Sequence, residues 1–126
     1  MKELDIWHAQ VSEEALEPER PIIDAHHHLW RAGTPYEIDD LWVDTRSGHN
    51  IVGTVFIECG SEYRLDGPIS LRPVGETEYV RRQVEYSQRH KMMGQPPVLG
   101  MVSHADLTLG TAVKDVLEAH AESAGG

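Results

Sequence analysis

The stretch that most constrains the fold of this chain is residues 51–60, which is apolar almost without interruption. A strand that is apolar on both faces is typical of a parallel sheet covered by helices. Residues 22–30 and 98–104 are two further strand-length segments. Helix-like sequence occupies residues 77–90, and a stripe at Leu109, Val113, Val116 and Leu117 has helical spacing. This alternation predicts an α/β fold with right-handed βαβ units and parallel strands.

The chain has 126 residues, which is within the range of a single domain. We expect residues 1–20, which are polar, to form an N-terminal arm. Within that arm, Ser12-Glu13-Glu14 resembles a short helix start that Pro18 limits. Residues 21–126 are expected to form the folded part.

Charge and composition exclude several classes of function. The formal net charge is −10, whereas nucleic-acid binding needs a basic surface, so no nucleic-acid partner is expected. No apolar run approaches the ~20 residues of a membrane-spanning helix, and the first residues lack the apolar core of a secretory signal. The single cysteine allows no intrachain disulfide. We therefore expect a cytoplasmic protein without a membrane partner.

The residues most typical of a chemical site are His26 and His28. Side chains alternate along a strand, so these two histidines should share a face with Asp24 and Trp30, while His27 points the other way. Two imidazoles at this spacing can converge on one metal ion, with metal–nitrogen distances of about 2.0–2.1 Å. A solvated strand end or a hydrogen-bonded core pair is the alternative, because a catalytic zinc site needs about three protein ligands.

The segment Ile-Ile-Asp-Ala-His-His-His-Leu-Trp at 22–30 resembles the first-strand signature of the amidohydrolase superfamily. Residues 48–60, 72–78 and 104–110 are similar to a lactonase-like branch of that superfamily, and the resemblance extends over residues 11–126. It implies a partial TIM (β/α)8 barrel, with His26 and His28 as ligands of a divalent metal, most simply zinc. It also implies an active site at the carboxyl ends of the strands, although some lactonases of this branch are thought to work without a metal.

The same resemblance implies that much of the barrel is missing from this sequence. A barrel of this type needs about 200 residues, and the chain supplies about three βα units. The later strands of relatives carry further ligands and a catalytic Asp. A natural truncation, a split enzyme and a fragment are all open interpretations.

Other polar residues near predicted strand ends are weaker candidates. Glu58 and His104 follow buried strands, where barrel enzymes place functional groups, so both could line a pocket. Ser103, His104 and Asp106 lie too close along one strand for a catalytic triad.

Substrate contacts are also suggested by residue type. Arg64 and Arg72 could bind a substrate carboxylate, although a loop arginine is more often solvated or paired with an acid such as Asp66. Trp30 could line the pocket, although core packing is the commoner role of an aromatic side chain.

The resemblance implies a metal-dependent hydrolase acting on a small molecule, either a lactone or cyclic ester or an amide, and we expect this chain alone to be inactive. The alternative is a non-catalytic remnant, or one subunit of a split enzyme. Under both readings open strand edges predict a homo-oligomer or a complementary chain as partner.

Overall fold

The computed structural model describes residues 3–92 and 94–125, which form an α/β fold around one three-stranded sheet. The strands are β1 (Pro21–His27), β2 (Asn50–Ile57) and β3 (Val98–Val102), in the order β1-β2-β3, and both pairs are parallel. The predicted α/β class with parallel strands is confirmed. Each strand ends two or three residues before its predicted end.

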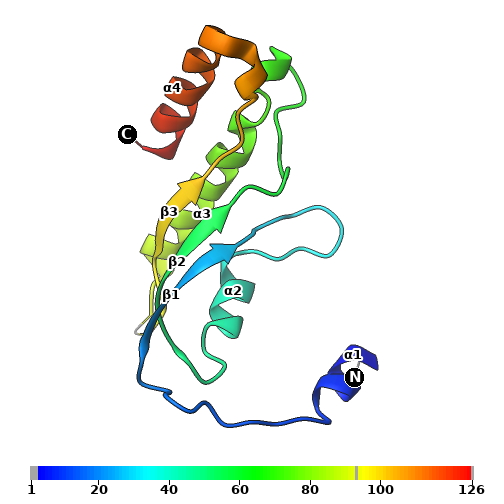
Figure 1. Cartoon of the computed structure of the whole chain (residues 1–126), viewed down its shortest axis with the longest axis vertical. Coiled ribbons are helices and arrows are strands. Elements are labelled where there is room, and N and C mark those ends of the chain that lie inside the picture. Colours follow the sequence, from blue (N-terminus) through cyan, green and yellow to red (C-terminus); the bar gives the residue numbers. More distant parts are fainter. Residues whose placement is uncertain (1–2, 93, 126) are drawn as a thin grey trace.

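The helices connect and cover these strands (Figure 1). α2 (Ile38–Asp44) lies between β1 and β2, α3 (Val74–His90) between β2 and β3, and α4 (Val113–Ala124) follows β3. The short 3-10 helices η1 (Ile69–Leu71) and η2 (Leu107–Ala112) precede α3 and α4. In the part of the chain that is described, no helix is long and apolar enough to cross a bilayer.

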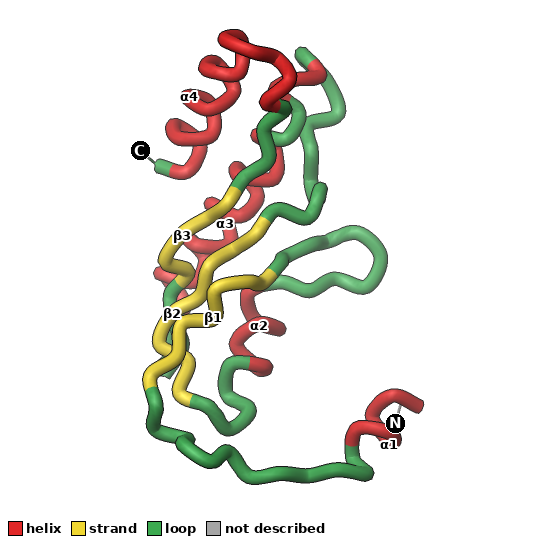
Figure 2. Tube along the Cα trace, viewed as in Figure 1, coloured by secondary structure: helices red, strands yellow, loops and turns green. Residues whose placement is uncertain are grey.

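The N-terminal segment differs from its prediction. A short helix, α1 (Glu3–His8), precedes the expected position, and residues 12–15 have no regular structure. None of the α1 residues is buried, and Figures 1 and 2 show the segment extending away from the sheet. Without tertiary packing, an acidic helix start at residue 12 is too weak a signal to hold a helix of its own.

The last helix also begins later than predicted. Residues 107–112 form a 3-10 segment with a kink at Gly110, whose φ of 61° and ψ of −134° are non-helical and are readily adopted only by glycine. Of the predicted apolar stripe only Val116 is buried, whereas Leu117 is 49% exposed. His120, four residues after Val116, is the other buried residue of α4. The packed face of this helix is therefore partly polar.

The core lies between the sheet and the helices α2 and α3. It contains Leu29, Ile38, Leu41, Trp42, Phe56, Tyr79, Val80 and Val84. The opposite face of the sheet is open, because Ile23 and Leu99 are 54% and 57% exposed there. Leu99 lies over Gly53, whose added Cβ would come within 2.3 Å of the Leu99 side chain. An uncovered apolar sheet face of this kind is a surface that further structure would normally cover.

Candidate functional site

The carboxyl ends of the three strands meet at one edge of the sheet, and the predicted site residues lie there. His26 and His28 lie at and just after the end of β1, with ring centroids 5.0 Å apart and planes at 90°. His27 between them is 6% exposed and packs edge-on against Phe56. The structure therefore brings His26 and His28 together and directs His27 into the core.

Asp24 does not share the face of the two histidines, contrary to the expectation from strand alternation. Asp24 is aligned with Thr54, and His27 is aligned with Phe56. The three-residue step from Asp24 to His27 along β1 therefore matches a two-residue step along β2. Thr54 and Phe56 are both buried, and Phe56 belongs to the core between the sheet and the helices. This irregularity reverses the alternation, and the Asp24 Oδ1 accepts a hydrogen bond of 3.1 Å from the His26 backbone N–H.

The His28 ring is oriented by the neighbouring strand. Its Nδ1 lies 2.7 Å from the carbonyl oxygen of Ile57, at the end of β2. A carbonyl only accepts, so Nδ1 carries the proton and Nε2 of the neutral ring keeps its lone pair. Such a hydrogen bond is the usual way in which a protein fixes the tautomer of a metal-binding histidine.

The two histidines do not complete a metal site by themselves. Among residues 3–92 and 94–125, no group of three or more His, Cys, Asp or Glu side chains is placed to hold one ion. Two imidazole nitrogens with one tautomer fixed fit a divalent metal as a partial ligand set, and a catalytic zinc needs about three protein ligands.

Trp30 lies close to His28, and both line a pocket of about 390 Å³ with Cys59 and Ser61. The Trp30 ring stacks on Tyr36, with centroids 5.0 Å apart, and its Nε1 donates to the Thr34 carbonyl at 2.7 Å. These contacts hold the indole in place, and 37% of the residue remains exposed. The position is compatible with a substrate contact.

The two loop arginines have different surroundings. Arg64 forms an ion pair with Glu78, rather than with Asp66, and this hydrogen bond lowers the pKa of Glu78. Arg64 is thus engaged within the protein. Arg72 lines a pocket of about 410 Å³, and its Nε is shielded from solvent without a hydrogen-bond partner among the described residues.

Glu58 and His104, predicted as separate pocket residues, form a pair. His104 Nδ1 lies 3.2 Å from Glu58 Oε2, and the two side chains are 44% and 38% exposed. They follow β2 and β3, which are neighbours in the sheet. Parallel strands place residues that follow their carboxyl ends at the same edge, which explains how residues 46 positions apart meet.

Two buried polar residues near this edge were not predicted from the sequence. Glu76, 2% exposed, accepts hydrogen bonds from the backbone N–H groups of Cys59 at 3.0 Å and Ser61 at 2.8 Å. The thiol of Cys59 also contacts this carboxylate, and burial together with that contact raises the pKa of Cys59 to about 11. The thiol therefore stays protonated near neutral pH and is a poor nucleophile.

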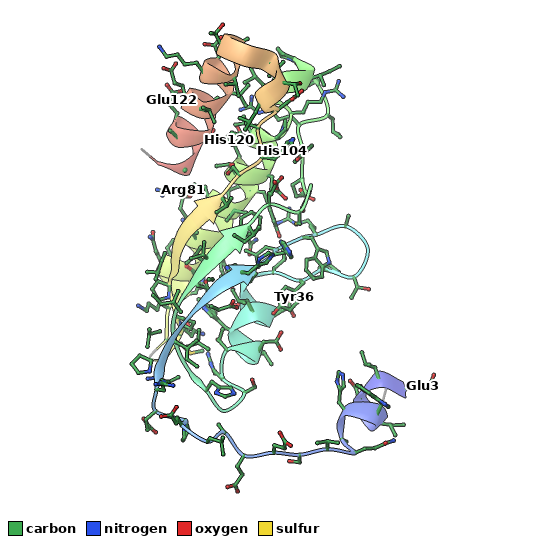
Figure 3. All side chains as sticks on the ribbon, viewed as in Figure 1. Glu3, Tyr36, Arg81, His104, His120 and Glu122 are labelled. Carbon is green, nitrogen blue, oxygen red and sulfur yellow. The ribbon has the colours of Figure 1, made fainter. Side chains whose placement is uncertain are left out.

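The second buried residue, His120, connects α4 to α3 and to the end of β3. Its Nε2 donates to the His104 carbonyl at 2.8 Å, so Nδ1 of the neutral ring accepts from the Thr77 hydroxyl at 2.8 Å. Thr77 in turn contacts the Ser103 hydroxyl at 2.7 Å. Figure 3 shows His120 on α4 beside the segment that carries His104. Each of these two residues had a signal in the sequence. Glu76 is an acid directly after Gly75, and His120 is a histidine on the packed side of a helix.

Comparison with known proteins identifies no relative: no family model, no curated protein and no solved structure matches the chain. The resemblance to amidohydrolases thus stays a prediction.

Proposed function

We propose that the chain is part of a metal-dependent hydrolase of the amidohydrolase superfamily, acting on a lactone or other cyclic ester, or on an amide. The single observation that supports this most is the His26–His28 pair at the end of β1, with His28 Nδ1 held by the Ile57 carbonyl. That arrangement leaves Nε2 of His28 available as a ligand.

In this proposal His26 and His28 hold a divalent metal, most simply zinc. When bound, the metal supplies Lewis-acid polarisation of the scissile carbonyl. Trp30, beside His28, would contact the substrate. Arg72, another predicted substrate contact, lines a separate pocket with His104. Arg64 was predicted in the same role, but its ion pair with Glu78 would first have to open.

The same proposal treats the sheet as about three βα units of a (β/α)8 barrel. Its support is the order of parallel strands, the helices on one face and the exposed apolar side chains on the other. In such a barrel that open face becomes the packed interior. The remaining strands and metal ligands would come from a longer chain, from a complementary chain or from other copies.

A non-catalytic remnant that assembles as an oligomer is the second candidate. It is favoured by the lack of a third metal ligand among the described residues and by the open apolar face, which another copy could cover.

A measurement of metal-dependent turnover distinguishes the hydrolase from the non-catalytic remnant. We expect the chain alone to show little or no zinc- or manganese-dependent hydrolysis of lactones, esters or amides. Adding the complementary strands should produce turnover that His26→Ala abolishes. Turnover by the chain alone that needs metal and His26 would show that the site is already complete. Purified protein with less than about a tenth of an equivalent of metal would contradict a retained metal site.

A further inference from the structure

We infer that the Glu58–His104 pair forms a second acid–base site, independent of any metal, in which His104 is a general base for the hydrolysis of small neutral esters. This inference goes beyond the proposed metal site, because the pocket of His104 shares no lining residue with the pockets of the His26–His28 pair.

The first support is the carboxylate of Glu58 beside the His104 ring. Its Nδ1 lies 3.2 Å from the Glu58 carboxylate, which only accepts hydrogen bonds when it is ionised. The carboxylate beside Nδ1 favours the tautomer that carries the proton of the neutral ring on Nδ1 and leaves the lone pair on Nε2. A carboxylate in this position orients the imidazole and stabilises the imidazolium that forms when Nε2 takes up a proton.

The second support is the anchoring of the His104 main chain. The His104 carbonyl accepts from His120 Nε2, and Thr77 holds the other nitrogen of that ring. The contact between Thr77 and the Ser103 hydroxyl fixes the preceding residue as well. Positioning from three elements, β3, α3 and α4, reduces the cost of holding the base in one geometry.

The third support is the pocket of about 410 Å³ that His104 lines with Tyr63, Arg72, Pro73 and Leu109. Arg72 is part of this lining and provides positive charge for a developing oxyanion. Asp106 also lines the pocket. Its carboxylate accepts hydrogen bonds from the backbone N–H and the hydroxyl of Thr108, and so it does not hold His104. Apolar lining together with two nearby acids, Glu58 and Asp106, favours a neutral ester over an anionic ligand.

The reaction needs only water as the second reactant. His104 Nε2 removes a proton from a water molecule while the water oxygen bonds to the acyl carbon, and Arg72 faces the resulting oxyanion. The bond from the acyl carbon to the leaving oxygen then breaks, and that oxygen takes the proton from Nε2. The products are a carboxylic acid and an alcohol, and the imidazole is regenerated.

The test uses hydrolysis of 4-nitrophenyl acetate by the intact chain in the presence of EDTA, which separates it from the metal-dependent activity proposed above. We expect His104→Gln to lower the protein-dependent rate at least about tenfold, since general-base catalysis contributes about 10²–10⁴-fold. His49→Gln, which removes an exposed histidine, is the matched control and should keep the rate. Equal rates in these two variants, or no rate above that of free imidazole, would overturn the inference.

The positioning role of Glu58 has its own readout in the nitrogen NMR spectrum of the His104 ring. The wild-type ring should be the Nδ1–H tautomer when neutral, and Glu58→Ala should shift it toward Nε2–H and lower the rate about tenfold. This measurement does not depend on whether His104→Gln folds. An Nε2–H tautomer in the wild-type protein would refute the acid–base role.

Discussion

At the scale of single residues, His28 and His104 are arranged in the same way. The Nδ1 of His28 donates to the Ile57 carbonyl at the end of β2, and the Nδ1 of His104 lies 3.2 Å from the Glu58 carboxylate just beyond it. Both surroundings favour a neutral ring with its proton on Nδ1 and a lone pair on Nε2. The end of β2 thereby places an oxygen beside one histidine from each of its two neighbouring strands. This is a property of the fold, because no local sequence pattern links residues 28, 57 and 104.

Glu76 stabilises the loop that follows β2, and we predict that Glu76→Ala lowers the free energy of unfolding by about 1–3 kcal/mol. The substitution leaves the N–H groups of Cys59 and Ser61 without their buried acceptor. Urea denaturation measures the effect. Glu118→Ala is the control, because its pair with Lys114 is exposed and should change stability by less than about 0.5 kcal/mol. Equal effects would contradict the role of Glu76.

The Arg64–Glu78 pair predicts a small pH dependence. The hydrogen bond from Arg64 lowers the folded pKa of Glu78, so its stabilisation is present above the unfolded value of 4.5 and is lost as the pH falls through the folded pKa. Because the pair is partly exposed, Glu78→Gln should cost at most about 1 kcal/mol near pH 7. Urea unfolding at about pH 3 should show the difference from wild type shrinking toward zero; a constant difference would contradict the assignment.

At the scale of elements, the start of α3 packs directly against the loop after β2. A Cβ on Gly75 would lie 2.5 Å from the Glu62 carbonyl oxygen and 2.6 Å from the Arg64 backbone nitrogen. We predict that Gly75→Ala destabilises the protein by about 1–3 kcal/mol despite the better helix propensity of alanine. Gly100→Ala, where nothing lies within 4 Å, is the matched control. Thermal unfolding compares the two, and equal midpoints would refute the close approach.

Element types were predictable from the sequence, and their details were not. Apolar runs and helical periodicity identify the three strands and α3, because each reports burial along a whole segment. The irregularity between Asp24 and His27 and the break at Gly110 depend on how neighbouring segments pack. For the same reason the packed side of α4 includes His120, whose polar ring is satisfied only by tertiary hydrogen bonds.

The candidate site was predictable to a similar extent. The spacing of His26 and His28 predicts their proximity, and strand ends predict Glu58 and His104 one at a time. The contact between Glu58 and His104 requires the strand order, which the sequence leaves open. Glu76 was missed because an acid in the first turn of a helix normally faces solvent and interacts with the helix dipole.

At the scale of the whole molecule, the open sheet face predicts association. Ile23 and Leu99 are more than half exposed on that face, and edge strands readily pair with another chain. We predict a dimer or larger assembly in light scattering after gel filtration, and Ile23→Lys should shift it toward monomer. Val43→Lys, an exposed site on α2, is the control. A wild-type protein that stays monomeric at NMR concentrations would contradict this prediction.

The proposal that His26 and His28 share one metal ion is tested most directly by titrating zinc into the labelled protein and following the ring nitrogens of both histidines. The account predicts one saturable event in which Nε2 of His28 and a ring nitrogen of His26 shift together. Loss of either ring should weaken binding at least about tenfold, since even outer partners of metal ligands contribute about 10–100-fold. Zinc binding that shifts only one of the two rings, or that His26→Ala leaves unchanged, would contradict it.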